Sequence, residues 1–253
     1  MTKFLIIKLC KICQKSFYFS ENILCMFVCS TAGISYDLNI ILKWMDKLDV
    51  ESFEFMINPE SKWNLNLVAQ KLKDYDIKSV HGNRDIAKLI LNDRKEGIKT
   101  LEENLEFMHK VDANFLVLHA WDPRSAFNIE DLLVLENYRD SIVIENIPSI
   151  YPIKDLFDFF AKLKFKFTLD LAWLYFSNDF RILNYDIVNV HIRDFKDENP
   201  RTKIFRGDVN FKEIFEKLGE KQYTFEAIYR KYYKNPEDVN DDLKRIKKIL
   251  NKK

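Results

Sequence analysis

Six residues of the kinds that bind metal ions each end a short, mostly apolar run of the sequence. They comprise three histidines, two glutamates and one aspartate: His81, His119, Glu145, Asp170, His191 and Glu226. The run Ile142–Ile144 before Glu145 is typical of a buried strand, where a bare carboxylate is costly unless it is paired, protonated or bound to a metal. Imidazole and carboxylate ligands without a thiolate suit Mn²⁺, Zn²⁺, Mg²⁺, Co²⁺ or Fe²⁺ and do not decide among them. Together the six residues predict a divalent-metal site.

Apolar residues precede all six of these groups at positions that share one face of a strand. Side chains alternate between the two faces of a strand, so the apolar residues should point outward and the six polar groups inward. The outward set comprises Val80, Leu118, Ile144, Leu169, Val190 and Phe225, with Leu116, Ile142, Phe167, Val188 and Tyr223 two positions further back. The fourth histidine, His109, lies in a helical pattern and should face solvent.

The elements that must position these groups alternate regularly along the chain. Strands are expected at 25–30, 51–57, 77–82, 114–120, 141–146, 166–171, 187–192 and 222–229. Amphipathic helices are expected at 37–48, 66–75, 96–111, 153–164, 210–219 and 235–252. Alternating βα units give a parallel sheet with right-handed crossovers, and eight of them can close into a (β/α)8 TIM barrel. A doubly wound open sheet is the alternative, but no Gly-rich phosphate loop follows the first strand.

Composition indicates a globular chain without a broad electrostatic preference. Of its 253 residues, 47% are hydrophobic and 31% are charged, and 40 basic against 39 acidic side chains give a net charge of +1. That balance gives no reason to expect nucleic acid or an anionic membrane as a partner. No apolar run approaches the ~18 residues of a membrane span, and no secretory signal is convincing, so a cytoplasmic location is predicted.

All four cysteines lie within the first 29 residues, with the spacing C-x2-C-x11-C-x3-C. They are Cys10, Cys13, Cys25 and Cys29. The spacing suggests a zinc knuckle, but no histidine accompanies the cysteines and Cys29 belongs to the first expected strand. We therefore interpret residues 1–25 as an N-terminal extension, with an upstream start as one explanation for it, and residues 26–253 as one barrel domain.

Six short motifs, in their order and placement, resemble the xylose-isomerase-like TIM barrels. This superfamily includes sugar isomerases, sugar epimerases and apurinic endonucleases. The motifs are VHGN (80–83), LHA (118–120), IENIP (144–148), LDLAW (169–173), VHIRD (190–194) and FEAIY (225–229), and the resemblance covers roughly residues 26–250. It implies a metal-dependent enzyme that isomerises or epimerises a small sugar or sugar derivative.

The isomerase and epimerase branch also implies roles for individual residues. One divalent ion (Mn, Zn, Mg or Co) would be held by a set that this chain matches completely: Glu145, Asp170, His191 and Glu226. Glu145 and Glu226 would be the catalytic residues and would transfer a proton through a metal-bound enediolate. The expected contacts to a sugar-like substrate come from His81, Trp121, Trp173 and Arg193. Arg193 has an alternative pairing with Asp194, and a homo-oligomer is a further expectation.

The endonuclease branch implies a second metal site on the same barrel. His81 and His119 match a pair that binds a second zinc ion, which is bridged by the strand-five glutamate, here Glu145. The third zinc of that branch needs a histidine where this chain has Trp173, and the loop after the seventh strand contains no histidine. The departure argues against cleavage at abasic sites. A one- or two-metal hydrolase or phosphodiesterase and a non-catalytic barrel stay as alternatives.

Overall fold

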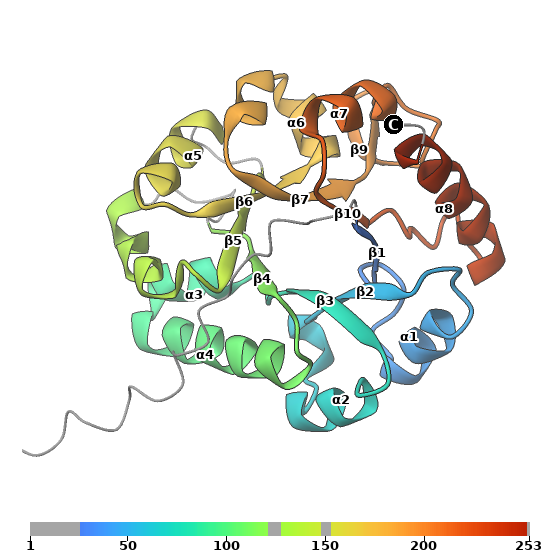
Figure 1. Ribbon diagram of the computed structural model, residues 1–253. Coiled ribbons are helices and arrows are strands. Elements are labelled where there is room, and N and C mark those ends of the chain that lie inside the picture. Colours follow the sequence, from blue (N-terminus) through green and yellow to red (C-terminus); the bar gives the residue numbers. More distant parts are fainter. Residues whose placement is uncertain (1–25, 121–127, 148–152, 252–253) are drawn as a thin grey trace, which may run out of the picture.

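Eight parallel strands form a closed barrel with the helices outside it (Figure 1). The computed structural model describes residues 26–120, 128–147 and 153–251. The order of the strands around the barrel is β1-β10-β7-β6-β5-β4-β3-β2. The predicted (β/α)8 TIM barrel is therefore confirmed, and the alternative open sheet is wrong. The predicted extension at 1–25, with three of the cysteines, lies outside the described residues.

Each barrel strand overlaps one of the eight predicted strands, although the strand predicted at 222–229 ends at Phe225. Their bounds are β1 (Met26–Ser30), β2 (Ser52–Met56), β3 (Asp76–His81), β4 (Phe115–Leu118), β5 (Ile142–Glu145), β6 (Lys166–Asp170), β7 (Ile187–Ile192) and β10 (Gln222–Phe225). Asp170 and His191 are register partners at the ends of β6 and β7. Since all the strands are parallel, their carboxyl ends meet at one mouth of the barrel, where enzymes of this architecture place their active sites.

The six predicted helices cover the outside of the barrel. They are α1 (Leu38–Met45), α2 (Leu65–Lys71), α4 (Arg94–Lys110), α5 (Ile153–Lys162), α7 (Phe211–Leu218) and α8 (Pro236–Leu250). Five of them begin at an Asn or Asp whose side chain accepts a hydrogen bond from the first helical turn, which stabilises helix starts. These residues are Asp37, Asn64, Asp93, Asn210 and Asn235. His109 on α4 is exposed, as predicted.

Several short elements were not predicted. They are the helices α3 (Ile86–Asn92) and α6 (Leu171–Ser177), the 3₁₀ helices η1 (Pro59–Ser61), η2 (Ile129–Tyr138) and η3 (Phe180–Asn184), and a hairpin of β8 (Asp194–Lys196) and β9 (Asn199–Thr202). The hairpin turn places Asp197 and Glu198 at φ angles of 49° and 60°. Such turns usually contain Asn-Gly or Asp-Gly, so a sequence with Asp-Glu gives no recognisable turn signal.

The main hydrophobic core lies between the strands and the surrounding helices. It contains the residues that were predicted to face outward, such as Ile144, Leu169 and Phe225, each fully buried. Val188 is an exception and corrects the prediction. The pairing of β6 with β7 shifts register, so that Phe167 pairs with Ile187 and Thr168 with Asn189. Val188 consequently packs against a small separate cluster of Phe115, Val117 and Val143.

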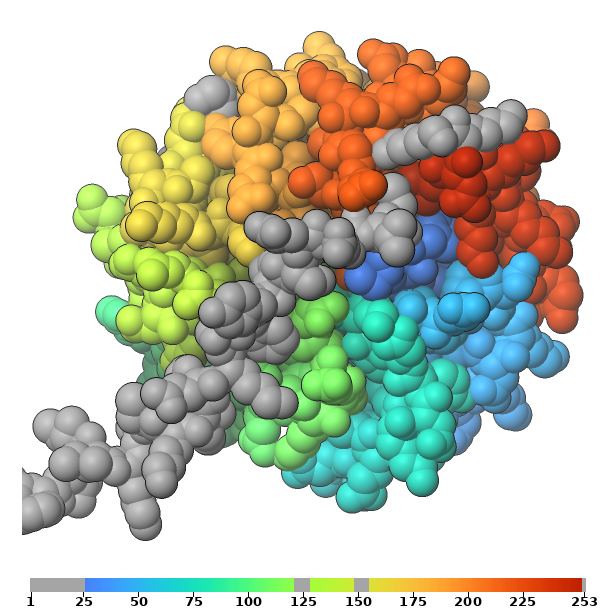
Figure 2. Space-filling model, in the orientation of Figure 1, coloured from blue at the N-terminus to red at the C-terminus, as the bar shows by residue number. Residues whose placement is uncertain are grey.

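The two ends of the described chain meet where the barrel closes. β1 pairs with β10 in parallel, with Met26 opposite Gln222. Outside this pair, the Asn240 side chain of α8 accepts a hydrogen bond from the Asp49 backbone at 2.8 Å and donates one to the Lys47 carbonyl at 3.0 Å. Figure 2 shows α8, in red, directly beside the blue N-terminal elements. No helix among residues 26–120, 128–147 and 153–251 is long and apolar enough to cross a membrane.

Candidate metal centre

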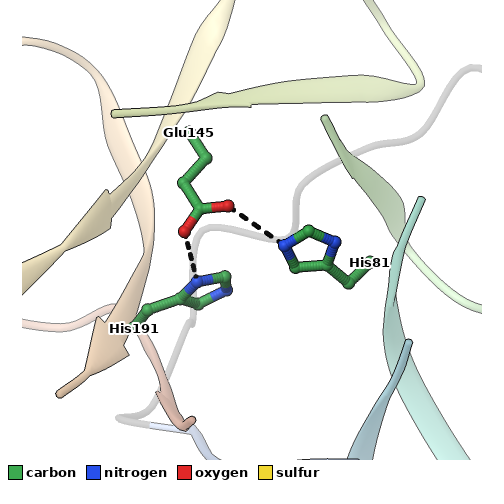
Figure 3. Close-up of side chains that lie close together, drawn as sticks. All are labelled: His81, Glu145 and His191. Atoms are coloured by element: carbon green, nitrogen blue, oxygen red, sulfur yellow. Dashed lines mark hydrogen bonds and ion pairs between the residues drawn. The ribbon is translucent and has the colours of Figure 1, made fainter. Parts of the chain in front are cut away.

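Glu145 lies at the centre of a group of histidines at the barrel mouth. Its Oε2 atom is 3.0 Å from His81 Nε2 and 2.7 Å from His119 Nε2, and its Oε1 atom is 2.9 Å from His191 Nδ1. Figure 3 shows the Glu145 carboxylate between the rings of His81 and His191, which come from β3 and β7. The buried carboxylate at the end of an apolar strand is thus paired, which is what its burial requires.

Four of the predicted ligands converge on one point. One ligand atom from each of Glu145, Asp170, His191 and Glu226 lies within 4.8 Å of the others. A divalent ion with ligand bonds of about 2.0–2.2 Å holds its ligand atoms about 3–4.4 Å apart. The three carboxylates of this group, all buried or nearly so, also supply negative charge that balances the charge of a divalent cation. The residues present therefore fit a divalent cation.

Glu226 adds a second sign of that fit. Its Oε2 atom is buried and has no hydrogen-bond partner among the described residues. The same atom lies 2.6 Å from His191 Nδ1 as an ion-pair contact, while that nitrogen has hydrogen-bond geometry toward Glu145. A buried carboxylate oxygen without a hydrogen bond is costly. A divalent cation held by these four residues would supply the missing partner.

Asp170 is held in place by three neighbours. The Asn146 side chain bonds both sides of the Asp170 backbone, accepting from its N–H at 2.5 Å and donating to its carbonyl at 3.0 Å. The Asp170 Oδ1 atom accepts from the Trp173 backbone N–H at 3.0 Å and caps α6. Its Oδ2 atom accepts from Arg193 Nη1 at 2.6 Å. The carboxylate position is consequently fixed relative to Glu145 and His191.

Arg193 points into the site rather than toward Asp194, so the alternative pairing is wrong. Besides Asp170, its guanidinium donates to the Tyr229 hydroxyl at 2.8 Å and to the Pro200 carbonyl at 3.1 Å. It also lies 5.4 Å from the centre of the Trp173 ring. The side chain therefore supports Asp170, and a contact from Arg193 or Trp173 to a substrate stays a prediction.

Two of these histidines, His81 and His191, have raised pKa values. Burial lowers the pKa of His81, but the hydrogen bond and charge of Glu145, with the charges of Glu226 and Glu54, outweigh this and raise the pKa to about 9. His191 is also desolvated, yet the carboxylates of Glu226, Glu54 and Glu145 raise its pKa well above the usual range. Burial opposes ionisation of Glu145, but the charges of His191 and His119 hold its pKa well below normal.

Asp170 differs from Glu145, because burial raises its pKa more than its ion pair with Arg193 lowers it. Desolvation, with the charges of Glu145 and Glu226, raises the pKa of Asp170 to about 6 despite the attraction of Arg193. The pKa of Arg193 is raised by the charge of Asp170, although burial opposes that shift. The pKa values of Asp170 and Arg193 can both be raised, because the negative charges of Glu145 and Glu226 also act on Asp170.

This leads to a prediction for the variant Asp170→Asn. A folded-state pKa above the unfolded one means that stability is lost as the pH rises through about 6. At pH 7.5 the ionised Asp170 should therefore cost about 1–3 kcal/mol. Asn keeps one acceptor oxygen for the Trp173 N–H but loses the oxygen that accepts from Arg193, which lowers its stability at every pH. The test is therefore the change with pH: in urea denaturation we expect the metal-free wild type to lose about 1 kcal/mol relative to Asp170→Asn between pH 5 and pH 7.5. A stability difference that stays constant over this range would contradict the raised pKa of Asp170.

The structure brings together seven of the nine residues predicted for the site. Of the other two, one lies at its edge and one is outside the described residues. The seven are His81, His119, Glu145, Asp170, His191, Arg193 and Glu226. Trp173 lies at the edge through its contacts with Asp170 and Arg193, and Trp121 is outside the described residues. Asn146 and Tyr229 were missed as supporting residues. Both stand in the quoted motifs, IENIP and FEAIY, but only their contacts reveal what they hold.

Comparison with known proteins identifies the fold. No protein-family model and no curated protein matches the chain. D-allulose 3-epimerase from Methylomonas sp., in complex with D-allulose, is 13% identical with a TM-score of 0.68, over 90% of this chain and 98% of that one. 3-keto-D-glucoside 4-epimerase from E. coli is 18% identical with a TM-score of 0.67, over 88% and 99%. The IOLI protein with a bound zinc atom is 14% identical with a TM-score of 0.64, over 90% and 98%.

These structures share one architecture with this chain. Another of them is a xylose isomerase domain protein from Salmonella typhimurium, 16% identical with a TM-score of 0.66, over 91% and 99%. The chain therefore has the fold of the xylose-isomerase-like TIM barrels, as its motifs predicted.

Proposed function

We propose that this protein is a divalent-metal-dependent isomerase or epimerase of a small sugar or sugar derivative. The observation that carries the proposal is the convergence of Glu145, Asp170, His191 and Glu226 within 4.8 Å at the barrel mouth. Two proteins of the same fold are epimerases of sugars, acting on D-allulose and a 3-keto-D-glucoside, and a third binds zinc. Mn²⁺, Zn²⁺, Mg²⁺ and Co²⁺ all suit this ligand set.

The four residues divide into holding groups and proton-transferring groups. Asp170, fixed by Asn146 and Arg193, and His191 hold the ion. When bound, a divalent ion stabilises the negative charge that develops on the oxygens of a sugar as a neighbouring proton is removed. Glu145 and Glu226 transfer that proton.

The charges around the two glutamates set the protonation state in which they would begin the reaction. Burial opposes their ionisation, but the charge of His191 lowers the pKa of each, so both are ionised and able to accept a proton at neutral pH. Glu226, with 12% of its side chain exposed, is more accessible from the mouth than Glu145, with 2%. We infer that Glu226 meets the substrate from the open side and Glu145 from the floor of the site.

Solvent exchange tests this reaction class without knowledge of the product. We expect the metal-loaded protein to incorporate deuterium from D₂O at the carbon beside the carbonyl of at least one ketose or aldose in a screened panel. The measurement is mass spectrometry of the recovered sugars, with protein treated with chelator as the control. A protein that binds its metal ion and exchanges no proton in any sugar of the panel would contradict the proposal.

A two-metal hydrolase or phosphodiesterase is the second candidate, and one contact favours it. His81 and His119 both approach the same oxygen of Glu145, at 3.0 and 2.7 Å. Their ring centres are 4.9 Å apart. A carboxylate that is shared in this way can bridge two metal ions. Two ions per chain favour this candidate, one favours the isomerase or epimerase, and none favours a barrel without catalysis.

A further inference from the structure

A fourth carboxylate, Glu54 on β2, lies buried in the barrel beside the candidate metal centre. Its side chain is fully inaccessible to solvent. Its Oε1 and Oε2 atoms lie 3.3 and 3.4 Å from His191 Nε2, the nitrogen that faces away from the other ligands. Glu54 Oε1 has no hydrogen bond with good geometry among the described residues. Burying a carboxylate with so few bonds is costly, so a role in packing alone does not explain it.

A chain of polar side chains inside the barrel holds Glu54 in this position. Ser79 on β3 donates to Glu54 Oε2 at 2.9 Å, and Gln222 on β10 donates to Ser79 at 2.9 Å. Gln222 also donates to Thr224 at 3.1 Å, and Thr224 donates to Asn189 at 2.9 Å. All of these side chains are buried. The chain thus connects Glu54 through Ser79 to side chains of β10 and β7 inside the barrel.

The two ring nitrogens of His191 have different surroundings. Nδ1 faces Glu145 at 2.9 Å and Glu226 at 2.6 Å, which places it among the other ligand candidates. Nε2 faces Glu54 alone among the contacts of the described residues. A metal-bound imidazole carries its remaining proton on the other nitrogen, and a carboxylate that accepts this proton fixes both the tautomer and the ring orientation.

We propose that Glu54 is a positioning residue of the metal centre. It accepts a hydrogen bond from the Nε2–H of His191 and so presents Nδ1 to the ion, an inference that rests on the proposed metal-dependent function. The separations of 3.3 and 3.4 Å are long for a hydrogen bond. We expect them to shorten when the ion is bound. In this role Glu54 would contact neither the ion nor the substrate.

The first test compares metal affinity in matched variants. Glu54→Gln keeps the shape of the side chain but removes its charge and allows its amide to donate to Nε2, which favours the wrong tautomer. Loss of such a partner typically weakens metal binding about 10–100-fold. We expect a loss of this size for Co²⁺ in chelator competition, together with a changed visible spectrum of the bound Co²⁺. The matched control is Asp242→Asn, which neutralises another buried carboxylate. Asp242 lies on α8, where its contacts are with Tyr233, Lys203 and Arg245, so this variant should leave both readouts unchanged.

The second test needs no variant and so does not depend on whether Glu54→Gln folds. In the wild-type protein loaded with Zn²⁺, nuclear magnetic resonance should show His191 protonated on Nε2, with a downfield, slowly exchanging proton. A ring with its proton on Nδ1 overturns the proposal. Equal Co²⁺ affinities and spectra in the wild type and Glu54→Gln also overturn it but leave the proposed metal centre intact, as does an equal loss in Asp242→Asn. A wild type that binds neither ion overturns both this inference and the proposed function.

Discussion

Replacing Glu145 with Gln is expected to remove the bound metal ion and to lower turnover by at least about 10²–10⁴-fold, the usual contribution of an acid–base group. The carboxylate joins three histidines, through contacts of 2.7 to 3.0 Å with His81, His119 and His191. An amide of the same shape supplies no negative charge to a cation and accepts no proton. The fold should persist, because the surrounding strands are held by the apolar core behind Ile144.

The measurements are metal content, turnover and the circular dichroism of the folded protein. Asp242→Asn is a matched control because it neutralises another buried carboxylate, on α8, where Asp242 accepts from the Tyr233 hydroxyl at 2.8 Å. This control should cost some stability but keep both metal and activity. Unchanged metal content and turnover in Glu145→Gln would show that the histidines and carboxylates at the mouth are not a working site.

Metal binding is expected to tighten about tenfold for each pH unit between pH 6 and 8 for every proton that the ion displaces. His191 holds a proton at neutral pH, because the carboxylates of Glu226, Glu54 and Glu145 outweigh its burial and raise its pKa. A metal ion and a proton cannot both occupy Nδ1. Release of one proton therefore makes the ion bind about 100-fold more tightly at pH 8 than at pH 6.

Calorimetry in two buffers of different ionisation enthalpy counts the protons released. We expect at least one proton per ion, and two if His81, with a pKa of about 9, also becomes a ligand. The exposed His109 offers a control, since His109→Ala should leave both the proton count and the slope unchanged. An affinity that is constant from pH 6 to 8 would contradict the assignment of His191 as a ligand.

The inward face of the barrel could be predicted from the sequence, because apolar residues and ligand candidates alternate along the strands. Each ligand candidate follows an apolar residue on a strand, and the parity of a strand then determines which side chains share a face. His81, Glu145 and His191 therefore converge as predicted (Figure 3). The prediction failed at Val188, where a register shift between β6 and β7 interrupts the alternation. Alternation alone carries no sign of such a shift.

The supporting contacts could not be predicted, because they join residues far apart in sequence. Arg193 was expected near substrate, yet its guanidinium bonds Asp170, which is 23 residues away. The contact between Glu54 and His191 likewise joins residues that are 137 positions apart in the chain. The β8–β9 hairpin was missed because Asp197 and Glu198 occupy a turn that normally contains glycine. Such details depend on how the closed barrel brings strands together.

The metal content of the purified protein tests the central claim most directly. Protein prepared without chelator, and incubated with Mn²⁺, Co²⁺ or Zn²⁺ before desalting, should carry one ion per chain by elemental mass spectrometry. Glu145→Gln beside it should carry none. A wild-type chain that retains no ion under any of these conditions would mean that Glu145, Asp170, His191 and Glu226 form an ion-paired barrel mouth and not a metal centre.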